Sequence, residues 1–380
     1  MSQFNKKVFV AMSGGVDSSV AALLLKNQGY DVLGVYMKNW SEPVLGEQCA
    51  WERDQEDARR VAGRLDIPFY TFDFEREYKQ EVVDYMIKEY ALGRTPNPDV
   101  MCNKIIKFGL FLQKALALGA DYVATGHYVK VKNAKVKIQN ASSKFKISLL
   151  AAKDSNKDQS YFLWTLTQDR LKYCLFPIGD YTKPEVRQIA KEAGLSTAHK
   201  LDSQGVCFMG EFSMQEFLRQ YIPEKTGEVV TTGGQRIGQH PGVNFYTIGQ
   251  RHGIGIGGGV PYYVVQKDIS TNRLVIVQGP KDDALYKRKA IVSDINWISE
   301  EPQLPKKVMA RIRYRQELQE ALLMKYEGGS MKQANEVFDS FHNSSFILHF
   351  SKPQRAVTPG QSAVFYDTLG DVMLGGGVIQ

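Results

Sequence analysis

The sequence predicts an α/β protein with an N-terminal doubly wound parallel sheet, a small, mainly β central domain and a C-terminal β barrel. Three observations lead to this prediction. Up to about residue 200, short apolar runs alternate with helical patterns, as in a parallel sheet with crossover helices. From about residue 205, glycines become frequent and apolar residues alternate with polar ones, as in half-buried antiparallel strands. The length of 380 residues exceeds what one hydrophobic core usually serves, so we expect domains at 1–204, 205–284 and 285–380.

Apolar runs predict the strands, and amphipathic patterns between them predict the helices. In the first domain the expected strands are 8–12, 32–37, 69–72 and 122–125. The expected helices are 18–28, 53–65, 76–89 and 104–117. In the β half we expect a hairpin of 262–266 with 273–277, and strands at 308–315, 346–350 and 363–366. The polar segments 130–146 and 327–345 are expected to be surface excursions.

The amino-acid composition excludes some classes of protein and favours others. Hydrophobic residues make up 43% and charged residues 23%, and no apolar stretch approaches the roughly 18 residues that a membrane helix needs. We therefore expect no membrane role and a cytoplasmic location. The net charge of +7 and the pI near 9.0 favour polyanionic partners. The four cysteines lie far apart without zinc-ligand spacing, so no metal site is expected, and Cys49 and Cys174 are interpreted as buried thiols.

The strongest local motif is the Ser-Gly-Gly-Val-Asp-Ser-Ser run at 13–19, between the first strand and the first helix. Glycines at this junction let successive N–H groups, hydroxyls and the positive helix end face one anion. The run lacks the Gly-Lys-Ser/Thr of a Walker A loop. It resembles the PP-loop of ATP pyrophosphatases, with Asp17 helping to hold Mg²⁺ on the departing pyrophosphate. The alternatives are a turn that only packs the helix and, for Asp17, a helix cap.

A second glycine cluster, at 253–259, has a different interpretation. It lies in the β half with no helical pattern after it, so we interpret it as a tightly turning loop and not as a dinucleotide fingerprint.

Two of the cysteines are candidate catalytic residues. Cys102 stands before the helix expected from Lys104, where the helix dipole and the lysine favour a thiolate, so it is a plausible nucleophile. Cys207 follows a glycine-containing turn in a short apolar run, and on its own it indicates buried packing.

The motifs occur together in an order that resembles one family. Behind the loop come Asn-Pro-Asp at 97–99, Cys-Asn at 102–103, Lys-Asp-Gln-Ser-Tyr-Phe-Leu at 157–163 and Ser-Gln-Gly-Val-Cys-Phe at 203–208. The β half adds Gly-Gln-Arg at 249–251, Arg-Tyr-Arg-Gln at 313–316 and Thr-Pro-Gly-Gln-Ser-Ala-Val at 358–364. Together they resemble the tRNA-specific 2-thiouridylase (MnmA) family over nearly the whole chain, apart from the two polar excursions.

The resemblance implies an ATP-dependent enzyme that adenylates C2 of the wobble uridine of tRNA and then transfers persulfide sulfur to it. Cys207 would carry the persulfide, supplied by a sulfur-relay protein or a cysteine desulfurase. Cys102 would be the nucleophile that can form a disulfide with Cys207, and Asp99 a candidate for proton transfer or hydrogen bonding to the base. A plain Asx turn is the alternative for Asp99.

The resemblance also implies the binding residues. The implied ATP contacts are Ala11, Met12, Ser13, Gly14, Gly15, Val16, Asp17, Ser18, Met37 and Gly126. Ala11 stands where the family usually has glycine, a change of one methyl group. The implied contacts to the target base are Asn97, Pro98 and Asp99, and those to the rest of the tRNA are His127, Lys157, Asp158, Gln159, Arg313, Tyr314 and Gln361.

The strand expected at 308–315 would place three arginines, Arg311, Arg313 and Arg315, on one face. Such a row suits RNA phosphates, while Tyr314 or Arg313 could stack on an unpaired base. The alternative is a solvated strand face.

Two other functions remain open at this point. A PP-loop synthetase could adenylate a small molecule, but Cys102 and Cys207 would then have no purpose. A non-catalytic RNA-binding protein of a sulfur relay could use the loop only to sense nucleotide. Pyrophosphate release that needs both ATP and tRNA separates these readings.

Overall fold

The computed structural model describes residues 6–43, 51–138, 141–202, 213–257, 259–326 and 345–380. Cys49, Cys207 and most of the polar segment 327–345 lie outside these residues. Within them, no helix is long and apolar enough to cross a membrane.

The N-terminal domain is a five-stranded parallel sheet with the strand order β3-β2-β1-β4-β7. Its strands are β1 (Lys7–Ala11), β2 (Asp31–Lys38), β3 (Phe69–Asp73), β4 (Tyr122–Thr125) and β7 (Cys174–Leu175). The four predicted strands are confirmed, and β7 was not predicted because its two residues carry no pattern. The central position of β1 brings the segment after it to the middle of the carboxyl edge, where open α/β sheets bind ligands.

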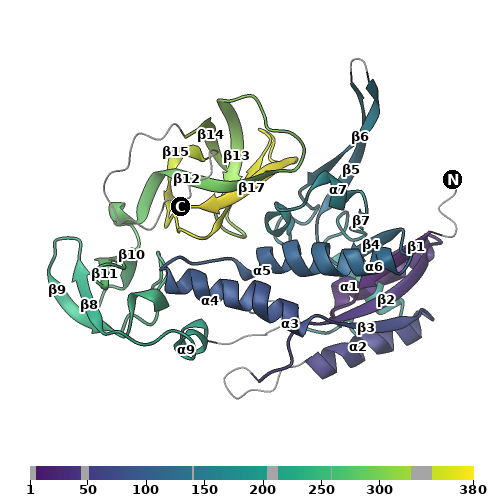
Figure 1. The fold of residues 1–380 in the computed structure, drawn as a ribbon, viewed down its shortest axis with the longest axis horizontal. Helices are drawn as coiled ribbons and strands as arrows, with labels where there is room; N and C mark the ends of the chain where they lie inside the picture. The colour runs from purple at the N-terminus through teal and green to yellow at the C-terminus, as the bar shows by residue number, and fades with distance from the viewer. Residues whose placement is uncertain (1–5, 44–50, 139–140, 203–212, 258, 327–344) are drawn as a thin grey trace.

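Helices cover both faces of this sheet, which confirms the doubly wound prediction (Figure 1). One face packs against α1 (Val16–Asn27), α2 (Trp51–Arg64) and α8 (Lys183–Glu192). The other face packs against a longer series of helical segments: α3 (Glu75–Tyr78), η1 (Lys79–Val83), α4 (Asp84–Ala91), α5 (Pro98–Met101), η2 (Cys102–Phe111) and α6 (Leu112–Ala117). Short helical turns follow at η3 (Ser160–Leu163) and α7 (Gln168–Leu171).

The helix predicted to begin at residue 104 begins earlier, at Pro98. The side chain of Asn97 accepts a hydrogen bond from the Val100 N–H (3.3 Å), and Pro98 occupies the first helical position, where its fixed φ favours a helix start. Cys102 therefore lies in the second turn and not before the helix. Because the effect of the helix dipole falls off within the first turn, the predicted dipole activation of Cys102 is wrong.

The central domain contains the sheet β10-β11-β8-β9, formed by β8 (Gly227–Thr231), β9 (Arg236–His240), β10 (Tyr262–Asp268) and β11 (Arg273–Gln278). The predicted hairpin of β10 and β11 is confirmed, and Asp268 accepts hydrogen bonds from Ser270 and Thr271 in its turn. Two details differ from the prediction: β8 and β11 are parallel, and a short helix, α9 (Met214–Arg219), precedes them. The glycine-rich stretch after the turn η4 (Val243–Phe245) contains no helix in its described residues.

The predicted C-terminal barrel is confirmed as six strands closed in the order β12-β15-β14-β13-β16-β17. After the turn η5 (Asp283–Leu285), its strands are β12 (Tyr286–Trp297), β13 (Lys306–Arg311), β14 (Gln319–Lys325), β15 (Phe346–Arg355), β16 (Ser362–Tyr366) and β17 (Met373–Ile379). The Ile312 N–H donates to the Gln316 side chain (2.9 Å), which closes a turn and ends β13 at Arg311. The predicted single row of arginines is therefore wrong: Arg313 and Arg315 lie in the turn, and Arg315 has a φ of 62°.

The polar segment 130–146 lies within a paired hairpin of β5 (Lys130–Ile138) and β6 (Ala141–Leu150). This hairpin extends away from the body of the molecule as an arm (Figure 1). At its base, the Gln168 side chain exchanges hydrogen bonds with the Ile147 backbone and donates to the Ile298 carbonyl, so both the first domain and the barrel hold it.

Candidate active site

The loop between β1 and α1 is shaped by glycines that admit no side chain. Gly14 has a φ of 75°, and a Cβ there would come within 2.2 Å of the Asp54 carbonyl oxygen of α2. A Cβ on Gly126, after β4, would lie 2.5 Å from the Ser18 backbone nitrogen. The end of β4 therefore closes on the N-terminus of α1, as a phosphate-binding turn requires.

Hydroxyl groups fix the loop from inside. The Ser13 N–H donates to Ser18 Oγ (3.1 Å), and the hydroxyls of Ser18 and Ser19 donate to the Gly15 carbonyl (3.2 and 2.8 Å). Thr197 Oγ1 donates to Ser19 Oγ (3.0 Å) from the segment after α8. Ser18 and Ser19 are buried whereas Ser13 is exposed, so Ser13 is the serine placed to meet a ligand.

The other residues implied for ATP lie around the same edge. Ala11 ends β1 and Met12 follows it, Val16 begins α1, and Met37 lies near the end of β2, all with buried side chains. The Met12 N–H donates to the Val35 carbonyl (2.8 Å), which keeps the β1 and β2 ends side by side.

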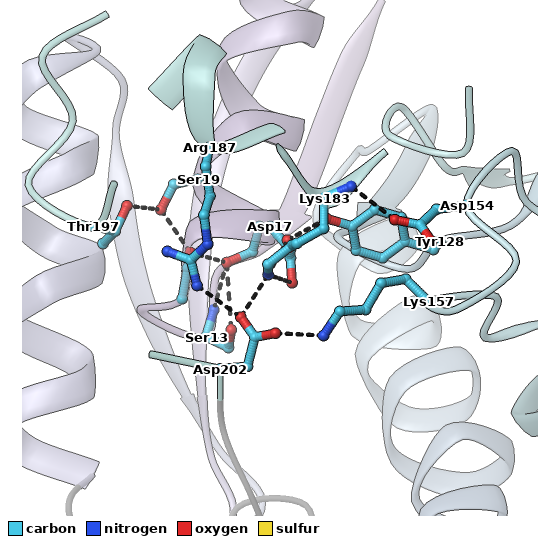
Figure 2. Close-up of polar contacts among 12 residues, drawn as sticks. Ser13, Asp17, Ser19, Tyr128, Asp154, Lys157, Lys183, Arg187, Thr197 and Asp202 are labelled. Carbon is cyan, nitrogen blue, oxygen red and sulfur yellow. Dashed lines mark hydrogen bonds and ion pairs between the residues drawn. The ribbon is translucent and has the colours of Figure 1, made fainter. Parts of the chain in front are cut away.

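Asp17 lies at the centre of a set of charged residues that we call the charged cluster: Asp17, Lys183 and Asp202. Lys183 Nζ donates to both carboxylate oxygens of Asp17 (2.8 and 2.9 Å) and lies 2.7 Å from Asp202 Oδ1. Figure 2 shows the ammonium group between the two carboxylates. The Tyr128 hydroxyl donates to Asp17 Oδ1 (2.7 Å), and burial together with the Asp17 charge raises the pKa of Tyr128, so it stays protonated.

Two further basic side chains form ion pairs with Asp202. Lys157 pairs with its Oδ2 and Arg187 Nη2 lies 3.0 Å from its Oδ1 (Figure 2). Burial acts to raise the pKa of Asp202, but the bonds and charges of Lys157 and Lys183 outweigh it and lower the pKa to about 2. The carboxylate is therefore ionised at neutral pH.

Sequence reasoning missed Lys183, Asp202 and Tyr128. A signal for Lys183 did exist: Thr182 and Glu185 form a capping box, with a proline in the first turn of α8. That helix start holds Lys183 in place, and the Lys183 N–H also donates to Asp154 Oδ2 (2.9 Å). The loop contains no lysine of its own, and Lys183 brings a positive charge to its carboxylate, Asp17.

Mg²⁺ in nucleotide sites is held mainly by phosphate oxygens and one or two carboxylates. Asp17 fits this requirement, because its carboxylate lies at the first turn of α1 beside the loop. Among the described residues, no group of three or more histidine, cysteine or acidic side chains forms a metal site by itself.

A buried amide at the same sheet edge has no partner among the described residues. Asn39 follows β2, is 1% exposed, and neither Nδ2 nor Oδ1 forms a hydrogen bond with another residue that the structure describes. Buried amides without partners are rare, and such groups commonly pair with a ligand or a water molecule. Asn39 is therefore a further candidate contact, which the sequence gave no reason to select.

Cys102 is fully buried, in the helical stretch that begins at Pro98. Asn97, Pro98 and Asp99 form the start of that stretch and are partly exposed. The Asn103 side chain donates to the Phe162 carbonyl (3.4 Å).

Three residues that the resemblance implies for tRNA contact have internal partners. Asp158 is 2% exposed and pairs with Arg311 Nη2 (3.2 Å). Gln159 Oε1 accepts from the Tyr128 N–H (3.0 Å). His127 is buried against the rings of Phe108 and Phe176, and burial, followed by the charge of Lys107, holds the pKa of His127 well below its usual range.

Of the other implied tRNA residues, Lys157 pairs with Asp202 beside the charged cluster, whereas Arg313, Tyr314 and Gln361 lie where the domains meet. Arg313 Nη2 donates to the Ala356 carbonyl (2.9 Å), and Gln361 Nε2 donates to the carbonyls of Thr95 and Pro96 (2.9 and 3.1 Å). The Tyr314 ring packs on Phe162 with 4.6 Å between centroids. Arg315 is exposed and lies over the Tyr314 ring.

Comparison with known proteins covers the whole chain. Family models match three consecutive parts: a tRNA methyl transferase HUP domain at 6–211, a tRNA methyl transferase PRC-barrel domain at 215–278 and an aminomethyltransferase beta-barrel domain at 287–379. Proteins named tRNA-specific 2-thiouridylase MnmA from Listeria monocytogenes serotype 4b and Alkaliphilus oremlandii are each 47% identical over 98% of this chain, and cover 94% and 96% of the relatives' own length. That of Geobacillus thermodenitrificans is 48% identical over 98% of this chain and 94% of its own length. The chain therefore belongs to the tRNA-specific 2-thiouridylase family.

Proposed function

We propose that this protein is an ATP-dependent tRNA 2-thiouridylase that converts the wobble uridine of the anticodon to 2-thiouridine. The observation that carries the proposal is the glycine loop at the carboxyl edge of the sheet with the charged cluster beside it. This site lies in a chain that matches relatives of that name over 98% of its length. The two cysteines give the adenylated base a nucleophile, which a small-molecule synthetase would not need.

In the first half-reaction, the uridine O2 attacks the α-phosphate of ATP, and pyrophosphate leaves. The loop N–H groups and the exposed Ser13 hydroxyl bind phosphate oxygens, and Lys183 supplies positive charge where the leaving group gains negative charge. Mg²⁺, held by Asp17 and the phosphates, would neutralise further charge on pyrophosphate. Phosphate binding requires Lys183 to exchange part of its contact with Asp17 for contact with the nucleotide.

In the second half-reaction, the terminal sulfur of a Cys207 persulfide attacks C2, and AMP leaves with the former O2. The Cys102 thiolate then attacks Cys207 Sγ, so that the bond between Cys207 and the transferred sulfur breaks and a Cys102–Cys207 disulfide forms. The electron pair of the broken bond stays on the sulfur that becomes the 2-thio group. A thiol reductant resets the disulfide before a sulfur-relay protein or a cysteine desulfurase reloads Cys207.

The helix start at 97–99 would receive the target uridine, with Asp99 hydrogen bonding to the ring. The buried position of Cys102 requires that the base or the neighbouring chain opens a path to its sulfur. We propose a cytoplasmic location, because tRNA and the sulfur donors are there.

The proposal is tested by reconstitution. Sulfur-loaded protein is incubated with ATP, Mg²⁺ and an unmodified tRNA transcript, and digested nucleosides are separated by mass. We expect 2-thiouridine only when ATP is present, and pyrophosphate release that depends on the tRNA. A matched transcript with cytidine at the wobble position is the control. Pyrophosphate release at the same rate with this control, or its absence with both transcripts, would exclude the proposed reaction.

A further inference from the structure

The loop that leads into the Cys102 helix is held by the barrel. The Thr95 N–H donates to the Pro359 carbonyl (2.9 Å), and Gln361 Nε2 donates to the carbonyls of Thr95 and Pro96. Thr95 itself is buried. Three hydrogen bonds thus join the last residues before the helix start to the turn between β15 and β16.

The contact is also close in space. Gly360 has a φ of 90°, and a Cβ there would come within 2.8 to 2.9 Å of the Thr95 backbone atoms. Because backbone atoms and not a flexible side chain oppose it, a methyl group at this position must displace one of the two segments.

Arg313 supports the barrel side of this contact. Its Nη2 donates to the Ala356 carbonyl (2.9 Å) and lies 3.5 Å from Thr358 Oγ1, just before Pro359 and Gly360. Ala356 has a φ of 54°, a conformation that needs such external support. Burial, followed by the charge of Arg355, lowers the pKa of Arg313, as expected for a guanidinium that serves an internal role.

The central domain completes the arrangement. Thr247 Oγ1 lies 3.2 Å from Thr95 Oγ1, and the Ile248 carbonyl lies 3.4 Å from Arg313 Nη2. A Cβ on Gly249 would come within 2.6 Å of the Ala356 Cβ. All three domains therefore meet at this point, which we call the junction: Thr95, Thr247, Arg313, Gly360 and Gln361.

From this geometry we infer that Arg313, Gly360 and Gln361 are positioning residues, which hold the loop 95–99 and the start of the Cys102 helix in their reactive place. The inference rests on the proposed thiolation reaction. Arg313 Nη2 and Gln361 Nε2 bond to backbone carbonyls of this chain, so the barrel helps to position the catalytic residues in addition to any contact with RNA. Misplacement of a reacting group by about 1 Å costs on the order of 100-fold in rate.

The test compares Gln361→Leu and Gly360→Ala with Gly370→Ala. Gly370 has a similar φ of 79° in the same barrel, but its added methyl would come close only to the end of the flexible Leu318 side chain (2.7 Å), with Met309 Cγ at an ordinary contact distance of 4.0 Å. We expect both junction variants to lower kcat for thiolation by about 10- to 100-fold while the Kd for tRNA and the KM for ATP stay within about twofold. The Gly370→Ala protein should keep its kcat.

Two results would overturn the inference. A raised Kd for tRNA with a normal kcat in Gln361→Leu would make Gln361 an RNA contact, and a Gly360→Ala effect no larger than that of Gly370→Ala would leave the junction without influence. If Gly360→Ala fails to fold, Gln361→Leu still decides. Amide hydrogen exchange at 97–101 tests this inference separately from the proposed reaction. Even if the wild type does not thiolate tRNA, the amides of the junction variants should exchange faster there than those of Gly370→Ala. Equal exchange rates would contradict the inference.

Discussion

Replacing Asp202 by asparagine is expected to destabilise the protein by about 2 kcal/mol at pH 7. The ordinary pKa of 3.8 is lowered to about 2 in the folded protein, and each pKa unit corresponds to about 1.36 kcal/mol. The Asp202 side chain is 27% exposed, so solvent screens its ion pairs only in part. The amide preserves the shape of the side chain but leaves Lys157, Lys183 and Arg187 opposite an uncharged group.

The sign of the pH dependence follows from the lowered pKa. The folded state favours the ionised carboxylate, so this stabilisation is complete above the unfolded pKa near 4 and is lost as the pH falls through about 2. About half of it remains at pH 3. The difference between wild type and Asp202→Asn should therefore shrink between pH 7 and pH 3.

Urea unfolding followed by circular dichroism measures this difference. The matched control is Asp169→Asn, because the Asp169 side chain is 93% exposed and its pair with Lys172 is expected to contribute at most about 0.5 kcal/mol. If Asp202→Asn loses no more stability than this control at pH 7, or loses the same amount at pH 3, then the ion pairs around Asp202 do not act as argued.

Four further predictions follow from the site. Asp17→Asn should abolish pyrophosphate release and keep the Kd for tRNA within about twofold; normal release excludes its role at the nucleotide. Arg315→Ala should weaken tRNA binding and reduce the salt slope by about one, as for one lost phosphate contact; an unchanged slope makes Arg315 a solvated residue only. Asn39→Leu should keep or raise the free energy of unfolding, because it removes an unpartnered amide, but should raise the KM for ATP; lower stability with an unchanged KM would show a structural amide. With a labelled persulfide donor, Cys207→Ser should accept no label, whereas Cys102→Ser should hold it on the protein without passing it to tRNA; label on Cys102 in the first variant reverses the assignment.

The helices and strands were predictable where their burial produces a regular pattern of apolar residues along the sequence. The strands β1, β2 and β4 are short, mostly buried apolar runs because parallel strands inside the sheet are covered on both faces, whereas the edge strand β3 buries little beyond Phe72 and was predicted from its aromatic residues. The start of the Cys102 helix was misplaced although its signals, Asn97 and Pro98, were visible, because a proline-rich stretch also fits an extended loop. β13 ends where the Gln316 side chain closes a turn on the backbone. A single contact of this kind leaves no periodic pattern in the sequence, so the sequence could not predict where the strand ends.

The nucleotide loop was predictable because its residues are consecutive and its geometry is local. The charged cluster was not, because Lys183 and Asp17 lie 166 positions apart and meet only after the sheet has formed. The prediction that the arginines of 308–315 form one exposed row was wrong for a similar reason. Arg311 has the alternation of a solvent-facing residue, but the surface that β13 presents there is covered by the first domain, where Asp158 pairs with it.

The segment 157–160 shows how site and barrel are connected. Lys157 pairs with Asp202 of the charged cluster, whereas Asp158 pairs with Arg311 of β13 and accepts from Ser160 Oγ (2.9 Å), which lies 2.8 Å from the Tyr366 hydroxyl in the barrel. Adjacent side chains thus contact two domains, and because Asp158 and Arg311 are both buried, separating them would leave a buried charge without its partner. A displacement of the barrel is therefore expected to reach the charged cluster through the peptide unit between Lys157 and Asp158, and the Cys102 helix through the junction. Because both routes begin in the barrel, a substitution that shifts the barrel is expected to affect the charged cluster and the Cys102 helix together.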